Sequence, residues 1–198
     1  MQLWLRHSHL CLRPDTVACD LPLATLYTIG HSTRTLNELL SALEVRSIET
    51  LVDIRAFPVS RRLPHFNRES LERELRQRRI KYVWMAALGG YRKQIRKDSP
   101  HTALRNKSLR NYADYTLTPE FSRAINELVA LAERSRTAYM CAERVYFRCH
   151  RMIVSDWLVA HGHEVLHIEG EGVMRAHKLM AEARMIDGEM IYSGGQLF

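Results

Sequence analysis

The sequence has few cysteines and lacks a long hydrophobic run. Its four cysteines are too few and too scattered for the disulfide framework of a secreted protein. Every apolar run is much shorter than the roughly 20 residues that cross a bilayer, and Arg6, His7 and His9 interrupt the apolar start of the chain. We therefore expect reduced thiols, no membrane-spanning helix, no signal peptide and a cytoplasmic protein.

Low-complexity tracts and internal repeats are also absent from the sequence. The chain has 198 residues, of which 46% are hydrophobic and 26% charged, so it can bury a sizeable core. We expect one domain over residues 26–198 and an N-terminal extension over residues 1–25. The formal net charge of +7 favours an anionic partner, and we expect a nucleic acid or a nucleotide, with non-specific basicity as the alternative. The sequence does not predict an oligomeric state.

Strand-like and helix-like segments alternate along the chain. Short apolar runs rich in β-favouring residues lie at 26–29, 50–54, 81–84, 137–141 and 164–168. Segments with helical periodicity lie between them, at 35–43, 68–79, 118–132 and 150–161. This order predicts an α/β fold with a mainly parallel sheet of about five strands and with helices on both faces.

Individual residues predict where the helices begin. Thr35 and Glu38 have the spacing of a capping box, and Asn67 has a side chain suited to an N-cap. Thr118 precedes Pro119, and proline is favoured at the first helical position. The basic stretch 92–110 predicts an irregular segment instead, either a solvated connector or a mobile loop that contacts anions.

Reactive or glycine-rich segments follow the carboxyl ends of four predicted strands. Ligands of open parallel sheets bind at this edge, because the connecting loops converge there. The sequence therefore predicts a binding or reaction site at the edge. Its candidate residues outside the cysteine segment are His31, Ser32, Asp53, Arg55, Arg61, Gly89, Gly90 and Tyr115.

The segment 141–151 carries the densest set of reactive side chains. Cys149 stands at the start of a predicted helix and is flanked by Arg148 and Arg151, which favour its thiolate and suit it to act as a nucleophile. The same helix start can instead hold a phosphate. Cys141 is the weaker nucleophile because Glu143 is nearby, and a small buried residue at a strand end is an equal interpretation.

A metal centre is the alternative interpretation of this segment. Cys141, Glu143, Cys149 and His150 are all residue types that bind zinc or iron. Their spacing does not match a closed zinc site built from two Cys-x-x-Cys pairs. We therefore predict no cofactor and keep zinc or iron as the alternative.

Asp53 and Arg55 lie two residues apart at a strand end, so their side chains can point to the same face and pair. Asp53 can then act as a base or orient a histidine, while Arg55, Arg61 and Arg62 can clamp an anionic group. The alternative is a strand-end salt bridge followed by a solvated basic loop.

Several short blocks of the sequence belong together, namely Tyr27–Ser32, Val52–Arg55, Phe57-Pro58, Ser60–Arg62, Leu88–Gly90, Tyr112–Tyr115, Cys141–Glu143 and Cys149–Arg151. Together they resemble the family catalogued as domain of unknown function 488. They occur in the order of that family, from Tyr27 to the tail with His177 and Asp187-Gly188. The resemblance implies an α/β fold and a site made from the motif residues.

Two classes of function follow from these residues. The first is an enzyme, either a hydrolase or a transferase, that acts on a phosphate-bearing substrate such as a nucleotide or nucleic acid. A loose similarity to sulfurtransferases adds a thiol-dependent variant of the enzyme. The second class is a non-catalytic nucleic-acid-binding module with structural cysteines, in which the basic loops contact phosphates.

The enzyme hypothesis assigns a role to each group of residues. Its acid/base residues are Asp53 and Glu143, its nucleophile is Cys149 or Cys141, its further catalytic residue is His150, and its anion-binding residues are Arg55 and Arg151.

Overall fold

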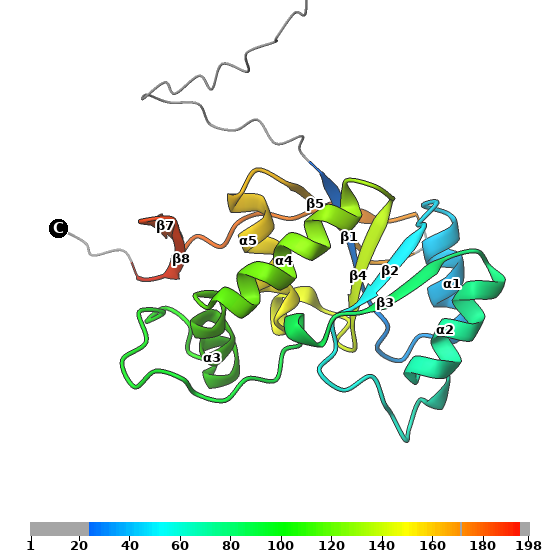
Figure 1. Cartoon of the computed structure of the whole chain (residues 1–198), viewed down its shortest axis with the longest axis horizontal. Helices are drawn as coiled ribbons and strands as arrows, with labels where there is room; N and C mark the ends of the chain where they lie inside the picture. Colours follow the sequence, from blue (N-terminus) through cyan, green and yellow to red (C-terminus); the bar gives the residue numbers. More distant parts are fainter. Residues whose placement is uncertain (1–23, 171, 195–198) are drawn as a thin grey trace, which may run out of the picture.

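The computed structural model describes residues 24–170 and 172–194 (Figure 1). Its strands are β1 (Thr25–Gly30), β2 (Thr50–Asp53), β3 (Lys81–Trp84), β4 (Thr137–Cys141), β5 (Glu164–Ile168), β6 (Met174–Ala176), β7 (Ala183–Ile186) and β8 (Glu189–Tyr192). Its α-helices are α1 (Leu36–Glu44), α2 (Arg68–Gln77), α3 (Lys107–Thr116), α4 (Pro119–Ala132) and α5 (Arg151–Ala160). The expected extension over residues 1–25, including Cys11 and Cys19, lies almost entirely outside the described residues.

Six strands form one sheet in the order β3-β2-β4-β1-β5-β6. The strands β1 to β5 are all parallel, whereas β6 is antiparallel to β5. The predicted α/β fold with a mainly parallel sheet is confirmed, although the sheet has six strands instead of about five. The sequence also does not predict the hairpin of β7 and β8, which pairs separately from the sheet.

Helices cover both faces of the sheet, as expected (Figure 1). On one face α1 and α2 bury Leu39, Leu43 and Leu75 against Ile29 of β1. On the other face α3, α4 and α5 form a second core cluster that includes Phe121, Leu128 and Val154 and reaches Tyr139 of β4. The sheet therefore lies between two hydrophobic layers, which explains why its strands β2 and β4 are buried along their whole length.

The predicted starts of α1 and α4 are confirmed. Thr35 Oγ1 accepts a hydrogen bond from the backbone N–H of Glu38, and the carboxylate of Glu38 accepts one from the backbone N–H of Thr35. Thr118 caps α4 by a single hydrogen bond, in which its Oγ1 accepts from the backbone N–H of Phe121, and Pro119 is the first residue of the helix.

The predicted capping role of the Asn67 side chain is wrong. Asn67 occupies the N-cap position of α2, but its side chain makes no hydrogen bond to the helix. Its Oδ1 instead accepts a hydrogen bond from the backbone N–H of Ser60 at 2.6 Å. The reason is that the loop before α2 folds back and presents this backbone donor to Asn67, which then stabilises the loop.

The basic stretch 92–110 is irregular only as far as residue 106. From Lys107 onward the chain is helical, so the prediction of an irregular segment is wrong at this end. Asn106 caps α3 by accepting hydrogen bonds from the backbone N–H groups of Ser108 and Leu109. The buried residues of α3 all lie beyond residue 110. The first part of the helix is basic and exposed or partly exposed, so the sequence shows no apolar helical periodicity there.

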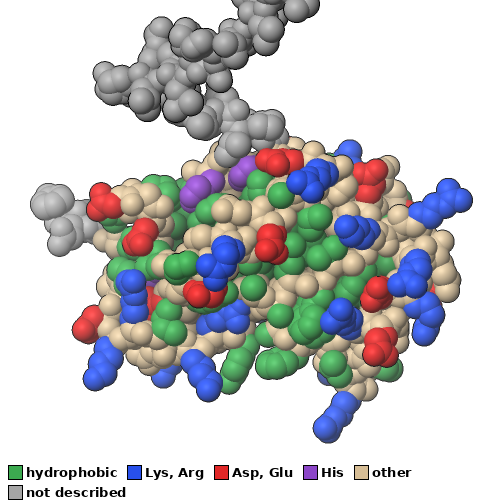
Figure 2. Space-filling model, viewed as in Figure 1, with side chains coloured by type: hydrophobic (Ala, Val, Ile, Leu, Met, Phe, Trp, Pro, Cys, Tyr) green, Lys and Arg blue, Asp and Glu red, His purple; other side chains and the backbone are tan. Residues whose placement is uncertain are grey.

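None of the described helices combines the length and apolar character that crossing a bilayer requires. The face of the molecule in Figure 2 carries Lys and Arg side chains around much of its outline, with acidic side chains between them.

The strand order places β4 between β1 and β2. The chain leaves β1 and β2 toward the face covered by α1 and α2, whereas it leaves β4 toward the face covered by α5. Loops that diverge to opposite faces from neighbouring parallel strands leave a crevice at the carboxyl ends of those strands. The fold therefore has its expected binding position at the carboxyl end of β4.

Candidate active site

Backbone hydrogen bonds bring the loops after β1 and β2 together with the end of β4. The N–H of His31 donates to Cys141 O at 3.1 Å, and the N–H of Ser32 donates to Ala142 O at 2.8 Å. On the other side of β4, the N–H of Ile54 donates to Met140 O at 2.9 Å. Segments far apart in the sequence thus meet at one edge of the sheet.

An open pocket of about 370 Å3 lies at this edge. Four of the predicted site residues line it, namely Arg55, Cys141, Glu143 and His150. Its remaining lining residues are Ala56, Phe57 and Ala142. The pocket therefore joins the end of β2 to the end of β4.

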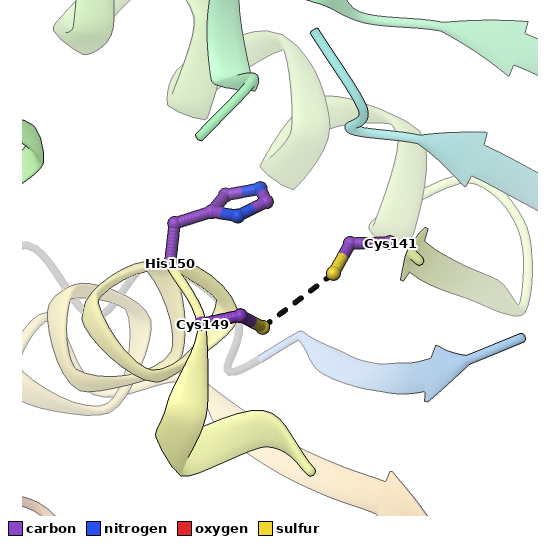
Figure 3. Close-up of side chains that lie close together, drawn as sticks. All are labelled: Cys141, Cys149 and His150. Atoms are coloured by element: carbon purple, nitrogen blue, oxygen red, sulfur yellow. Dashed lines mark hydrogen bonds between the residues drawn. The ribbon is translucent and has the colours of Figure 1, made fainter. Parts of the chain in front are cut away.

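Two thiols meet beside the pocket (Figure 3). The Sγ atoms of Cys141 and Cys149 are 3.5 Å apart, and the backbone N–H of Glu143 donates to Cys141 Sγ at 3.3 Å. Cys141 ends β4 and is buried, whereas Cys149 lies two residues before α5 and is half-buried. The two cysteines are eight residues apart in the sequence, and the short 3-10 helix Tyr146–Arg148 folds the chain so that they face each other.

The two thiols differ in acidity. A hydrogen bond from the Cys141 thiol lowers the pKa of Cys149 to about 6, and the nearby charge of Arg151 acts in the same direction. The same hydrogen bond, together with burial, raises the pKa of Cys141 well above its usual value. These two directions make Cys149 the more acidic thiol of the pair and favour Cys141 as the donor between them. The leading cause of the lowered pKa of Cys149 is the second cysteine and not the helix dipole, and its predicted role as the nucleophile stays a prediction.

Arg151 is buried and contacts the loop of Glu143, which lines the pocket. Its Nη2 donates to the carbonyl oxygens of Glu143 at 2.5 Å and of Arg144 at 3.0 Å, and its Nη1 donates to Thr28 Oγ1 at 3.2 Å. Within the described part of the chain, its Nε has no hydrogen-bond partner. Arg151 therefore holds the 143–144 loop against β1 and supplies positive charge to the thiols, while its predicted contact with a substrate anion stays a prediction.

His150 is a neutral, buried side chain. Its Nε2 lies 3.1 Å from the carbonyl oxygen of Ile54, which can only accept, so Nε2 carries the proton and Nδ1 has the lone pair. Burial lowers the pKa of His150 to about 4. The ring is thus uncharged at neutral pH and fixed in one tautomer.

The predicted glycines allow backbones to approach closely. A Cβ on Gly90 would stand 2.4 Å from Nδ1 of His150, and a Cβ on Gly89 would stand 2.7 Å from Cα of Ala56. At the end of β1, a Cβ on Gly30 would stand only 1.9 Å from the carbonyl oxygen of Glu143. These glycines shape the site because no larger residue fits against its walls.

Asp53 and Arg55 form the predicted pair at the end of β2. Arg55 Nε lies 2.9 Å from Asp53 Oδ1, and Arg55 Nη2 lies 2.5 Å from Asp53 Oδ2. Tyr82 Oη also donates to Oδ2 of this fully buried carboxylate, at 2.7 Å. Because both carboxylate oxygens already accept hydrogen bonds, Asp53 positions Arg55; its predicted role as a base stays a prediction.

Arg55 in turn organises His31. Arg55 Nη1 donates to Nε2 of His31 at 3.3 Å, so the ring proton of His31 is on Nδ1, which donates to the carbonyl oxygen of Ser32 at 3.2 Å. Burial, followed by the charge of Arg55, lowers the pKa of His31 to about 4. Arg55 Nη2 also donates to Phe66 O at 2.8 Å. His31, Asp53 and Arg55 thus form one buried network behind the pocket.

Besides Cys149, Arg151 and the glycines described above, three more predicted site residues lie outside the pocket lining and this network. Arg61 is exposed on the loop between β2 and α2. Tyr115 donates its hydroxyl proton to Ala87 O at 2.8 Å, and the guanidinium of Arg92 lies 4.0 Å from its ring centroid. Ser32 contributes its backbone and has a positive φ of 43°. Tyr115 and the backbone of Ser32 thus hold neighbouring backbone segments in place, whereas Arg61 lies on the exposed surface.

Sequence reasoning missed two aromatic residues of β3. Tyr82 binds Asp53, and Trp84 Nε1 donates to the carbonyl oxygen of Arg55 at 2.9 Å. Both stand next to the end of β2, since Asp53 is the register partner of Trp84. Their positions in a predicted strand identify them as strand residues, but the pairing of β3 with β2 is needed to place them at the site.

A second buried network was also missed. Nε2 of His177 lies 2.8 Å from Oδ1 of Asp156, and Nδ1 of His177 lies 2.9 Å from Nε2 of His167. Tyr192 Oη donates to Asp156 Oδ2 at 3.0 Å, and the ring of Tyr146 stacks on His167 with centroids 3.5 Å apart. The network ties the segment after β6 and the end of β8 to α5 and β5.

A metal ion has one candidate set of ligands among the described residues. The donor atoms of Cys141, Cys149 and His150 all lie within 4.8 Å of one another. Two thiols and one imidazole with an available lone pair are of the types that zinc accepts. Glu143, the fourth residue of the predicted alternative, is not part of this set. The residue types therefore fit zinc at three positions, and the metal alternative stays a prediction.

Comparison with known proteins identifies the family. The family model described as Domain of unknown function DUF488 matches residues 35–158, from the start of α1 into α5. No curated protein matches the chain, and no solved structure matches it. The match covers more than half of the 198 residues and includes the Asp53–Arg55 and Cys141–Arg151 segments. The chain therefore belongs to the DUF488 family, as the sequence blocks imply.

Proposed function

We propose that this protein is a thiol-dependent transferase in which Cys149 receives the transferred group and Cys141 resolves the intermediate. The observation that carries the proposal is the Sγ–Sγ distance of 3.5 Å between two thiols of opposite acidity beside an open pocket. A thiolate with a lowered pKa is an effective nucleophile, and a neighbouring thiol can attack the product that forms on it.

The pocket favours a soft electrophile over a phosphate. Arg55 and Arg151 are occupied by protein acceptors, and the exposed carboxylate of Glu143 lines the pocket. A carboxylate repels a phosphate dianion, whereas a sulfane sulfur requires no cationic cradle. These contacts support sulfur transfer, which is the thiol-dependent variant suggested by the loose similarity to sulfurtransferases.

The reaction has two steps. In the first, the Cys149 thiolate attacks the terminal sulfur of a persulfide R–S–SH, the S–S bond of the donor breaks, and R–S⁻ leaves while Cys149 becomes a persulfide. In the second, an acceptor nucleophile takes the outer sulfur and restores the thiol. Without an acceptor, Cys141 attacks the inner sulfur of Cys149, hydrogen sulfide leaves, and a disulfide forms.

The phosphate-bearing substrate and the nucleic-acid or nucleotide partner remain predictions from the sequence. A cytoplasmic location belongs to the same proposal, because both thiols must stay reduced between reactions and the cytoplasm supplies that condition.

Treatment with a low-molecular-weight persulfide, followed by mass spectrometry of the digested protein, tests the proposal. In the Cys141→Ser variant, the serine keeps a hydrogen-bond donor beside Cys149 but cannot form a disulfide. We expect its Cys149 peptide to gain the mass of one sulfur atom. We expect the unchanged protein to release sulfide and to form the Cys141–Cys149 disulfide.

The Cys149→Ser variant is the matched control and should do neither. Cys11 and Cys19 serve as internal references in the same digest. Sulfur addition to those two thiols as fast as to Cys149, or no addition to Cys149 at all, would overturn the proposal. A purified protein whose thiols are protected by tightly bound zinc would also overturn it, in favour of the metal alternative.

A further inference from the structure

Two aromatic side chains are exposed beside the thiol pocket. Phe57, on the loop after β2, is 70% exposed, and Tyr91, on the loop after β3, is 65% exposed. Their ring centroids are 6.0 Å apart, so the two loops present one aromatic surface. Phe57 also lines the thiol pocket. Exposed aromatic rings that lie together commonly mark a binding surface.

A basic groove begins at Tyr91. A depression of about 600 Å3 is lined by Tyr91, Arg92, Lys93 and Lys107 among others. A second depression of about 490 Å3 shares the lining residues Gln94, Lys107 and Asn111 with it, so the two adjoin each other. The second depression adds Arg96, Lys97 and Arg110.

Cations outnumber carboxylates along this groove. Of the two acidic residues that line it, Asp114 is buried and accepts a hydrogen bond from Ser99, which leaves Asp98 as the exposed carboxylate. Two arginines are fixed to the protein, since Arg92 donates to Ala87 O and Arg110 donates to Leu104 O. The six cations that line the groove are Arg92, Lys93, Arg96, Lys97, Lys107 and Arg110.

We propose that the aromatic pair and this groove, together called the basic track, bind single-stranded nucleic acid. Cations along a groove neutralise successive phosphates, while exposed aromatic rings stack on unpaired bases. A duplex keeps its bases stacked inside and offers only phosphates, so it cannot use Phe57 and Tyr91 in this way. In Figure 2 Lys and Arg side chains project along the lower left edge, beside hydrophobic side chains that project from the lower middle.

The track also leads to the thiols. Phe57 belongs both to the aromatic pair and to the lining of the thiol pocket, so a base stacked there would lie at the mouth of the pocket. That a bound strand faces a reactive cysteine rests on the proposed function. Binding of the strand to the track does not depend on it.

Fluorescence anisotropy with a labelled thymidine oligonucleotide tests the inference on the full chain. We expect the single strand to bind more tightly than a duplex of the same length, and Tyr91→Leu to weaken the binding about ten-fold, because a stacked base is lost. Tyr91→Phe keeps the ring and should bind as well as the unchanged protein.

A pair of charge variants tests the cations. Lys93→Gln combined with Lys97→Gln should reduce the slope of log K against log salt by about 1.4, since each phosphate contact on a single strand contributes about 0.7. Arg123→Gln combined with Arg134→Gln removes the same charge from exposed positions outside the track and should leave the slope unchanged. An equal loss in both pairs, equal affinity for single strand and duplex, or unchanged binding by Tyr91→Leu would overturn the inference.

The two proposals fail independently. Cys149→Ser should bind the oligonucleotide normally, and the track variants should still take up sulfur at Cys149. Loss of persulfide chemistry with intact oligonucleotide binding would reject only the proposed function. Intact persulfide chemistry without oligonucleotide binding would reject only the track.

Discussion

The substitution Arg55→Met tests whether the network behind the pocket is a stabilising unit. The guanidinium of Arg55 contacts both carboxylate oxygens of Asp53, the carbonyl oxygen of Phe66 and Nε2 of His31. Methionine has a similar length but no donors. After the substitution the fully buried carboxylate keeps only the hydroxyl of Tyr82 and the backbone N–H of residue 55 as donors.

The magnitude follows from the burial of this pair. Removing one partner of a buried ion pair leaves an uncompensated charge and costs about 3–5 kcal/mol. Arg78 offers a matched control, because it also makes two contacts of 2.9 Å to one carboxylate, that of Glu44, but both side chains are partly exposed. Exposed ion pairs contribute about 0–1 kcal/mol, so Arg78→Met should cost far less than Arg55→Met.

Urea unfolding followed by circular dichroism measures both free energies. Adding Asp53→Asn to Arg55→Met should recover part of the loss, since the neutral amide removes the buried charge while Tyr82 still has an acceptor. If Arg55→Met costs no more than Arg78→Met, or if Asp53→Asn makes it worse, the network does not stabilise the site as described.

Gly90→Ala would place a methyl group 2.4 Å from Nδ1 of His150, so we expect this variant to have a lower melting temperature. Gly170→Ala is the control, because nothing lies within 4 Å of its new Cβ, and it should not lower the melting temperature. Equal melting temperatures of the two variants would contradict the described packing around Gly90. We also expect the free energy of unfolding to fall in acid. Burial is the largest cause that lowers the pKa values of His31 and His150 to about 4 and of His167 to about 3, from an ordinary value of 6.5. Below pH 6.5 these histidines take up protons in the unfolded chain but not in the folded chain. Each histidine therefore lowers the free energy of unfolding by at most about 1.4 kcal/mol per pH unit, until the pH reaches its pKa in the folded protein. Urea midpoints at pH 7 and pH 5 measure this loss, and an unchanged midpoint would show that these rings are not buried as neutral groups.

Much of the fold follows from local patterns in the sequence. The runs at residues 50–54, 81–84 and 137–141 become β2, β3 and β4, because each is short, apolar and bounded by polar or helical segments. The capping box at Thr35 works because its hydrogen bonds involve only neighbouring residues. The candidate site could be located for a related reason, since the carboxyl ends of parallel strands meet at one edge whatever their order.

What the sequence could not predict depends on contacts between distant residues. The side chain of Asn67 binds Ser60 and not its own helix, because a loop conformation decides which donor is nearer. The acidity of Cys149 depends first on Cys141, and the loop that joins them must fold before they meet. The network of Asp156, His177 and His167 joins three segments whose sequence positions carry no common pattern.

The proposed sulfur transfer requires Cys149 to be a thiolate, stabilised by the thiol of Cys141. The most direct test is the rate of alkylation of Cys149 by iodoacetamide as a function of pH, measured peptide by peptide in the unchanged protein and in Cys141→Ala. We expect a midpoint near pH 6 in the unchanged protein and a midpoint shifted upward in the variant, because alanine cannot donate the hydrogen bond. A midpoint at or above the ordinary value of 9.0 in the unchanged protein, or the same midpoint in both proteins, would show that Cys141 does not stabilise a thiolate at Cys149.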